Sequence, residues 1–139
     1  MENAASHSIR VAIVDDHIIV SEMLALSISK ESDLALVGVV GNTVDAMKLV
    51  RRELPDVLLM NYRLPDGDCV GTIKGILIES PKTRVVVLSA SAEGDFVSRA
   101  TAAGCVGFLG KECSIADVLH AIRRAARGES VPEADVYSP

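Results

Sequence analysis

The sequence contains few cysteines, few aromatic residues and no large excess of charge of either sign. Its three cysteines, Cys69, Cys105 and Cys113, are scattered and form no CxxC pair, which argues against a disulfide framework and a zinc site. There is no tryptophan, and there are only two tyrosines and two phenylalanines. The 14 basic and 19 acidic residues give a formal net charge of −5, so the chain lacks the basic surface that nucleic acid or anionic lipid attracts.

Long apolar segments are missing too. The longest apolar run, from Leu34 to Val40, is far shorter than the roughly 18 residues that span a bilayer. Residues 1–10 are polar and lack the apolar centre of a targeting signal. We therefore expect a cytoplasmic protein with no membrane segment. A length of 139 residues suits one domain, which we expect at 9–128, after a disordered N-terminus at 1–8 and before a linker or tail at 129–139.

Five short apolar runs alternate with five amphipathic patterns. The runs, which predict buried strands, are 11–14, 34–40, 57–60, 85–88 and 106–109. The helices are predicted at about 17–30, from Asn42 to near Pro55, between Gly67 and Pro81, at about 93–103, and from Ser114 to Gly128. The predicted inward residues of the first helix are Val20, Met23, Leu24 and Ile28, and those of the last are Ile115, Val118, Leu119, Ile122 and Ala126. The helix at 93–103 has little to bury beyond Phe96 and Val97, and we expect it to be the most mobile.

Strict alternation of strands and helices predicts an α/β fold in which helices cover both faces of a parallel sheet. Right-handed crossovers make such a fold doubly wound. Function in these folds lies at the carboxyl ends of the strands. The polar residues at those ends are Asp15, Asp16, Asn61, Ser89 and Lys111. We expect four strands to direct these side chains into one crevice.

The residue types at these strand ends suit phosphoryl-transfer chemistry. The adjacent acids Asp15 and Asp16 suit Mg²⁺, which takes about six oxygens and keeps several of them as water. Lys111 and Ser89 could bind phosphoryl oxygens, and an aspartate at position 61 would complete the site. Taken singly, each residue would be as simply explained as a loop, turn or surface residue, and only their combination favours a site. His17 is most simply a polar residue at a helix start.

Together these motifs resemble the receiver domain of two-component response regulators, over about residues 9–128. The matching segments are the acid pair, PDVLLMNYRLPDG, VVVLSAS and GFLGKE. LPDGD and AGCVGFLGK are similar to the subgroup in which a helix-turn-helix DNA-binding domain follows the receiver. The resemblance implies the flavodoxin-like receiver fold, a doubly wound five-stranded parallel sheet in the order 2-1-3-4-5 with five helices.

The resemblance also implies a role for each site residue. The implied Mg²⁺ ligands are Asp15, Asp16, the side chain of Asn61 and the backbone carbonyl of Arg63, with Mg²⁺ weak or absent because position 61 is neutral. The implied phosphoryl-transfer residues are Ser89, Lys111 and the residue at position 61, the phospho-acceptor position. The implied switch residues are Ser89 and Phe108. The implied partners are a sensor histidine kinase, a second copy in a homodimer, and DNA only through a C-terminal domain outside this sequence.

Asn61 is the central departure from that family, whose acceptor is an aspartate. A carboxamide is a poor nucleophile and forms no stable acyl phosphate, so we expect this chain to stay unphosphorylated. One explanation is an engineered Asp→Asn substitution that holds the resting state; the other is a natural pseudo-receiver that acts as a phosphorylation-independent interaction module. The otherwise intact pocket favours the engineered form. We expect no enzyme, since aspartyl-phosphate phosphatases need a DxD motif where this chain reads Asp-Asp-His.

Overall fold

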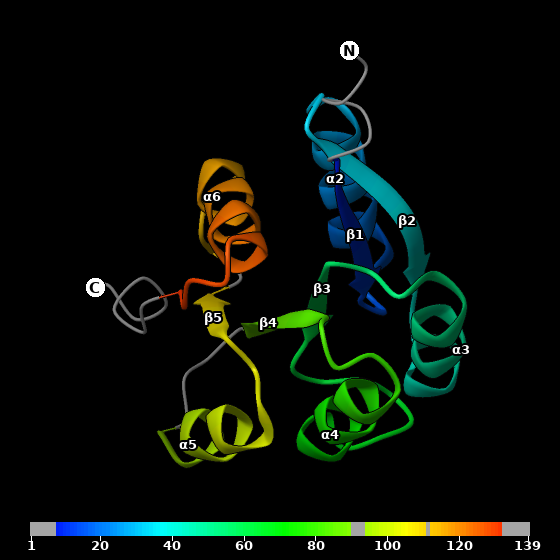
Figure 1. The fold of residues 1–139 in the computed structure, drawn as a ribbon, viewed down its shortest axis with the longest axis vertical. Coiled ribbons are helices and arrows are strands. Elements are labelled where there is room, and N and C mark those ends of the chain that lie inside the picture. Colours follow the sequence, from blue (N-terminus) through cyan, green and yellow to red (C-terminus); the bar gives the residue numbers. More distant parts are fainter. Residues whose placement is uncertain (1–7, 90–93, 111, 132–139) are drawn as a thin grey trace.

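The computed structural model of the protein describes residues 8–89, 94–110 and 112–131. Most of the predicted N-terminal segment and of the predicted tail therefore lies outside the described residues. Within them, strands and helices alternate along the chain without exception (Figure 1). No helix in these ranges is long and apolar enough to cross a membrane.

The sheet has five parallel strands in the order β2-β1-β3-β4-β5. The strands are β1 (Ile9–Val14), β2 (Leu34–Val40), β3 (Val57–Asn61), β4 (Arg84–Ser89) and β5 (Gly107–Gly110). The helices are α2 (Ile18–Ser29), α3 (Thr43–Glu53), α4 (Cys69–Glu79), α5 (Gly94–Ala103) and α6 (Ile115–Ala126). The predicted α/β class, doubly wound architecture and strand order are confirmed. The bounds of β2 are as predicted, and those of the other strands differ by at most two residues.

Two hydrophobic layers sandwich the sheet, which explains why the strands are apolar without alternation. Helices α3, α4 and α5 cover one face, and α2 and α6 cover the other (Figure 1). Neighbouring residues of one strand point into different layers: in β3, Leu58 and Met60 face the first group of helices, whereas Val57 and Leu59 face the second. Every strand residue between the two layers must therefore be apolar, so the first polar residue marks the end of the strand.

The predicted helix ends are also found. The side chain of Asn42 accepts a hydrogen bond of 2.8 Å from the backbone N–H of Asp45 and so caps α3. Ser114 and Asp117 form the predicted capping box at the start of α6. Gly128 follows α6 with φ of +82°, a left-handed conformation that suits glycine and stops the helix.

The inward faces of two helices differ from the prediction. Met23 of α2 is 55% exposed, and α2 buries Ser21 with Leu24 and Ile28. Because α2 is apolar on nearly all sides, the pattern of hydrophobic residues does not determine which side packs on the sheet. In α6 the small residues Ala121 and Ala125 are fully buried, while Leu119 and Ala126 lie half-buried at the edge of the contact.

The chain continues along the edge strand after α6. The backbone N–H of Val131 donates to the carbonyl of Val106, at 2.9 Å, directly before β5. The guanidinium of Arg124 donates to the carbonyl of Ser130 at 3.0 and 3.2 Å. The first residues of the predicted tail are therefore fastened to the domain.

Candidate functional site

Three strand ends bring Asp15, Asn61 and Ser89 to one edge of the sheet. β1 and β3 are neighbours with Val14 opposite Met60, so Asp15 and Asn61 follow at the same level. β4 lies on the other side of β3, with Leu88 opposite Asn61, and Ser89 comes one residue later. Asp15, Asn61 and Ser89 are all buried, which is rare for polar side chains and typical of a built site.

The acid pair forms a compact cluster with His17. An oxygen of Asp15, Oδ1, accepts a hydrogen bond of 2.9 Å from the backbone N–H of His17 and lies 3.1 Å from its Nδ1. The same ring nitrogen lies 3.7 Å from Oδ1 of Asp16. One potential ligand atom from each of the three residues lies within 4.8 Å of the others. His17 therefore belongs to the site as well as preceding α2, and its position next to the acid pair was the only signal of this in the sequence.

The side chain of Asn61 connects two loops of this cluster. Its Nδ2 donates to the backbone carbonyl of Arg63 at 2.7 Å and to Oδ1 of Asp16 at 3.2 Å. It also lies 3.5 Å from Nδ1 of His17. Both acceptor oxygens lack a hydrogen, so the amide nitrogen, and not the amide oxygen, must face them.

The oxygens of this pocket suit a hard cation, but the amide of Asn61 does not. Carboxylates of Asp15 and Asp16 with the carbonyl of Arg63 are the oxygen donors that Mg²⁺ prefers. The amide nitrogen of Asn61 donates hydrogen bonds to two of these three oxygen ligands, those of Asp16 and Arg63. A cation that used the same oxygens would require this side chain to leave its hydrogen bonds. In this arrangement the residue at position 61 does not fit the group that the resemblance implies.

Of the two remaining predicted site residues, only Ser89 is among the described residues. Ser89 ends β4 opposite Gly110, the last residue of β5. Lys111, which follows Gly110, lies outside the described residues. The register therefore brings the residue before Lys111 alongside Ser89.

Phe108, the predicted switch aromatic, lies buried at the end of a row of three rings. The centroids of Tyr62 and Phe96 are 4.0 Å apart, and those of Phe96 and Phe108 are 5.9 Å apart with an edge-to-face angle of 81°. The row runs from Tyr62, which follows Asn61, to Phe108 in β5. The sequence indicated Phe108 but gave no reason to join it to Tyr62 and Phe96.

The loop after β3 is tied to the start of α3. Asp66 accepts hydrogen bonds from the backbone N–H groups of Thr43 at 2.7 Å and Val44 at 3.3 Å. These bonds lower the pKa of the Asp66 carboxyl. The loop that carries the Arg63 carbonyl is thereby held against a second helix.

Comparison with known proteins agrees with this fold. The chain matches the response regulator receiver domain family over residues 11–123. It is 33% identical over 123 residues to YxjL, an uncharacterized transcriptional regulatory protein of Bacillus subtilis, covering 88% of this chain and 56% of that protein. It is also 33% identical over 129 residues to the response regulator VraR of Staphylococcus aureus, covering 93% of this chain and 62% of VraR.

Solved structures are similar as well. The signal receiver domain of NarL from Mycobacterium tuberculosis superposes with a TM-score of 0.84 at 29% identity, covering 88% of this chain and 99% of that one. A two-component response regulator of the LuxR family from Aurantimonas sp. SI85-9A1 gives a TM-score of 0.86 at 25% identity, covering 93% and 92% of the two chains.

The matched family region lies inside the range 9–128 that the sequence indicates for the domain. The chain spans between 56% and 62% of the length of YxjL and VraR, so it corresponds to one part of those regulators. The sheet order, the buried polar strand ends and these similarities lead to one conclusion: this chain belongs to the response regulator receiver domain family, with relatives of the LuxR/NarL type.

Proposed function

We propose that this domain is the receiver of a transcriptional response regulator and that it takes no phosphoryl group. The observation that supports the second part is the side chain at the end of β3. Asn61 is buried there, and its amide donates hydrogen bonds to Asp16 and Arg63. An amide has no anionic oxygen with which to attack a phosphoryl donor, so no acyl phosphate forms at this position.

The consequence is a domain that stays in its resting arrangement. In a receiver with an acid at position 61, a sensor histidine kinase would supply the phosphoryl group, and Ser89 and Lys111 would bind its oxygens. Ser89 and Phe108 would then pass the change to the outer strand β5. In this chain Ser89 at the end of β4 and Phe108 in β5 are both buried, and without a phosphoryl group nothing triggers their rearrangement.

The origin of Asn61 is part of the proposal. The acids of the pocket, Ser89 and Lys111 are all retained in the sequence, which favours an Asp→Asn substitution made in a receiver that otherwise works. An asparagine codon at position 61 of the source gene would contradict this origin. DNA recognition would belong to a separate domain, since a chain with net charge −5 offers DNA no basic surface.

The test is phosphorylation with acetyl phosphate and Mg²⁺, followed by intact mass. We expect no phosphoryl adduct on this chain, one adduct on Asn61→Asp, and none on Asn61→Ala, which controls for modification elsewhere. An adduct on residue 61 of the unaltered chain would contradict the proposal.

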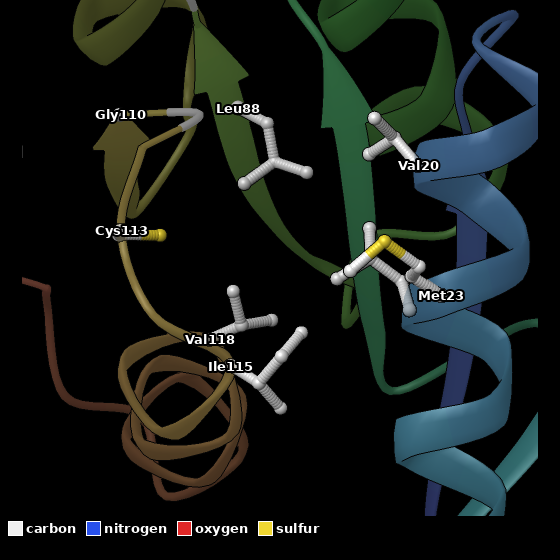
Figure 2. Close-up of a pocket in the computed structure, with 8 residues that line it drawn as sticks. Val20, Met23, Leu88, Gly110, Cys113, Ile115 and Val118 are labelled. Atoms are coloured by element: carbon white, nitrogen blue, oxygen red, sulfur yellow. The ribbon is translucent and has the colours of Figure 1, made fainter.

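A second candidate is a phosphorylation-independent interaction module, and the exposed face of α2 favours it. Ile18, Ile19, Met23 and Leu26 are between 55% and 75% exposed. Ile19, Met23 and Leu26 are spaced as in the contact seam of a helix pair, which suits a second copy of this chain. A groove of about 290 Å³ opens beside this face, and Figure 2 shows Met23 of α2 across it from Ile115 and Val118 of α6.

Oligomeric state tests this candidate. We expect Ile19→Glu to reduce self-association in sedimentation velocity and Ile78→Glu to leave it unchanged, because Ile78 is equally exposed, at 76%, but lies on α4. Self-association of Asn61→Asp that does not respond to phosphodonor would favour the module over the switch. A monomer at every concentration would contradict it.

A further inference from the structure

We propose that the amide nitrogen of Asn61 takes the place of the divalent cation in this pocket and holds the two loops that a cation would otherwise hold. The inference rests on the proposed receiver function for the identity of the cation, Mg²⁺. It differs from a simple loss of negative charge, because it assigns the side chain of Asn61 a structural role of its own.

The hydrogen bonds fix which end of the amide faces the pocket. Nδ2 has two hydrogens, and two acceptors lie within reach: the Arg63 carbonyl at 2.7 Å and Oδ1 of Asp16 at 3.2 Å. If the amide were rotated by 180°, its own oxygen would face these two oxygens. Both hydrogen bonds would be lost, and the oxygens would repel one another. The amide orientation is therefore set by its neighbours.

These two acceptors are the ones a cation would need. Asp16 follows β1, and Arg63 follows β3, so a Mg²⁺ ion bound to both would join the loops at the ends of two neighbouring strands. Asn61 joins the same two loops with hydrogen bonds. Its side chain does so without a net charge and without an ion.

Burial makes the exchange of amide for cation costly. Asn61 is 3% exposed, so an amide displaced by Mg²⁺ has little water to bond in place of its two partners. The remaining acid, Asp15, already accepts from the backbone N–H of His17 and lies within hydrogen-bond distance of its ring. We therefore infer that the pocket keeps the same arrangement with and without Mg²⁺.

Weak Mg²⁺ binding could come from the loss of negative charge at position 61 or from the amide in the cation position. These two explanations predict different Mg²⁺ affinities for Asn61→Ala. Alanine and asparagine are both neutral, so loss of charge alone predicts equal Mg²⁺ affinity. The alanine side chain has no N–H group to cover Asp16 and Arg63. If the amide occupies the cation position, removing it opens the site.

The experiment is calorimetric titration of the whole chain with Mg²⁺ alone, for the unaltered protein, Asn61→Ala and Asn61→Asp. We expect Asn61→Asp to bind most tightly and the unaltered protein to show no binding at Mg²⁺ concentrations that half-saturate Asn61→Ala. Its affinity would then be at least about tenfold lower than that of Asn61→Ala, as two competing hydrogen bonds of ordinary net strength imply. Mg²⁺ should raise the melting temperature of both variants and leave that of the unaltered protein unchanged. Equal or weaker binding by Asn61→Ala would overturn the proposal, because the amide oxygen would then be neutral or a ligand.

A second measurement needs no variant. In ¹⁵N-resolved NMR of the unaltered protein, we expect the side-chain amide signals of Asn61 to stay in place when Mg²⁺ is added. A saturable shift of those signals would overturn the proposal.

Two controls complete the test. Asp16→Asn added to Asn61→Asp should abolish Mg²⁺ binding, which shows that the calorimetric signal comes from this pocket. Phosphorylation is a separate readout: an Asn61→Asp chain that binds Mg²⁺ but gains no phosphoryl mass contradicts the proposed function and leaves this inference intact.

Discussion

The ring of Tyr62 lies 4.0 Å from the ring of Phe96, centroid to centroid, at an interplanar angle of 49°. Tyr62 directly follows Asn61, and Phe96 comes from α5, so this contact joins the pocket loop to the helix with the fewest large apolar side chains. Phe108 extends the contact to β5. Three of the four aromatic residues of the chain therefore serve one connection between the site and the edge of the sheet.

Replacing Phe96 tests how far α5 depends on this contact. Phe96 is 2% exposed, and Phe96→Ala would leave a cavity between Tyr62 and Phe108. We expect the free energy of unfolding to fall by roughly 3–5 kcal/mol in urea denaturation. Phe96→Leu, which keeps most of the volume, should cost clearly less. A loss below about 1 kcal/mol for Phe96→Ala would mean that the helix collapses onto the space without cost.

The sequence could predict the fold because its strands are buried on both faces. A strand that is covered on both sides ends at its first polar residue, and this placed Asp15, Asn61 and Ser89 at strand ends. The parallel order then brought those ends to one edge. The same reasoning could not choose the inward side of α2, where Met23 and Leu24 are equally apolar and only the packing against the sheet separates them.

The details of the site depended on groups that sequence patterns do not show. One of the two acceptors that orient the Asn61 amide is the backbone carbonyl of Arg63, and no side-chain pattern encodes that hydrogen bond. The contact of Asp66 with the start of α3 joins residues 23 positions apart. Lys111 was expected from the sequence and lies outside the described residues, so its role stays a prediction.

The contact between Gly107 and Val131 should couple the segment after α6 to β5. A Cβ atom added at Gly107 would overlap Cβ of Val131 and lie only 2.8 Å from its Cγ2. We expect Gly107→Ala to lower the free energy of unfolding by about 1–3 kcal/mol, as overpacking does, and to expose residues 129–131 to proteolysis.

A double-mutant cycle checks the cause of that loss. Val131→Gly removes the atoms that the added methyl group at position 107 would meet, so the cost of the pair should be smaller than the sum of the two single costs. Additive costs would show that Gly107 acts through its backbone and not through Val131. Gly71→Ala is a fair comparison, because a Cβ there would meet only the side chain of Asp68, at 3.2 Å or more.

The three cysteines should differ in reactivity. Burial raises the pKa of the Cys69 thiol to about 12 and that of Cys105 to about 11, so almost no thiolate is present at neutral pH. Burial also raises the pKa of Cys113, but this side chain is only half-buried and lines the groove beside α2. With iodoacetamide at pH 8, mass spectrometry should show labelling of Cys113 first and of the other two only after unfolding. Equal labelling of all three in the native protein would contradict the packing around α4.

The ion pairs of Arg123 should make stability depend on pH in the acid range. Its guanidinium donates to both carboxylate oxygens of Asp33 at 2.8 Å and to Glu31 at 2.8 Å, joining α6 to the turn before β2. The hydrogen bond from Arg123 lowers the pKa of Asp33 below its value in the unfolded chain. Its stabilising contribution is therefore present above the unfolded pKa and is lost as the pH falls through the lower, folded pKa.

Comparison of the unaltered protein with Asp33→Asn isolates this contribution. Because Asp33 is half-exposed and water screens the pair, we expect a difference in the free energy of unfolding of about 1 kcal/mol or less at pH 7. The difference should shrink in urea denaturation as the pH falls below 3.8, the ordinary pKa of the side chain. Glu79→Gln, which removes a longer and exposed pair with Arg51 at 3.3 Å, should change stability less at neutral pH. If the difference for Asp33→Asn were instead to grow as the pH falls, Asp33 would be stabilised in its protonated form, and the bidentate contact with Arg123 would not be what holds the turn to α6.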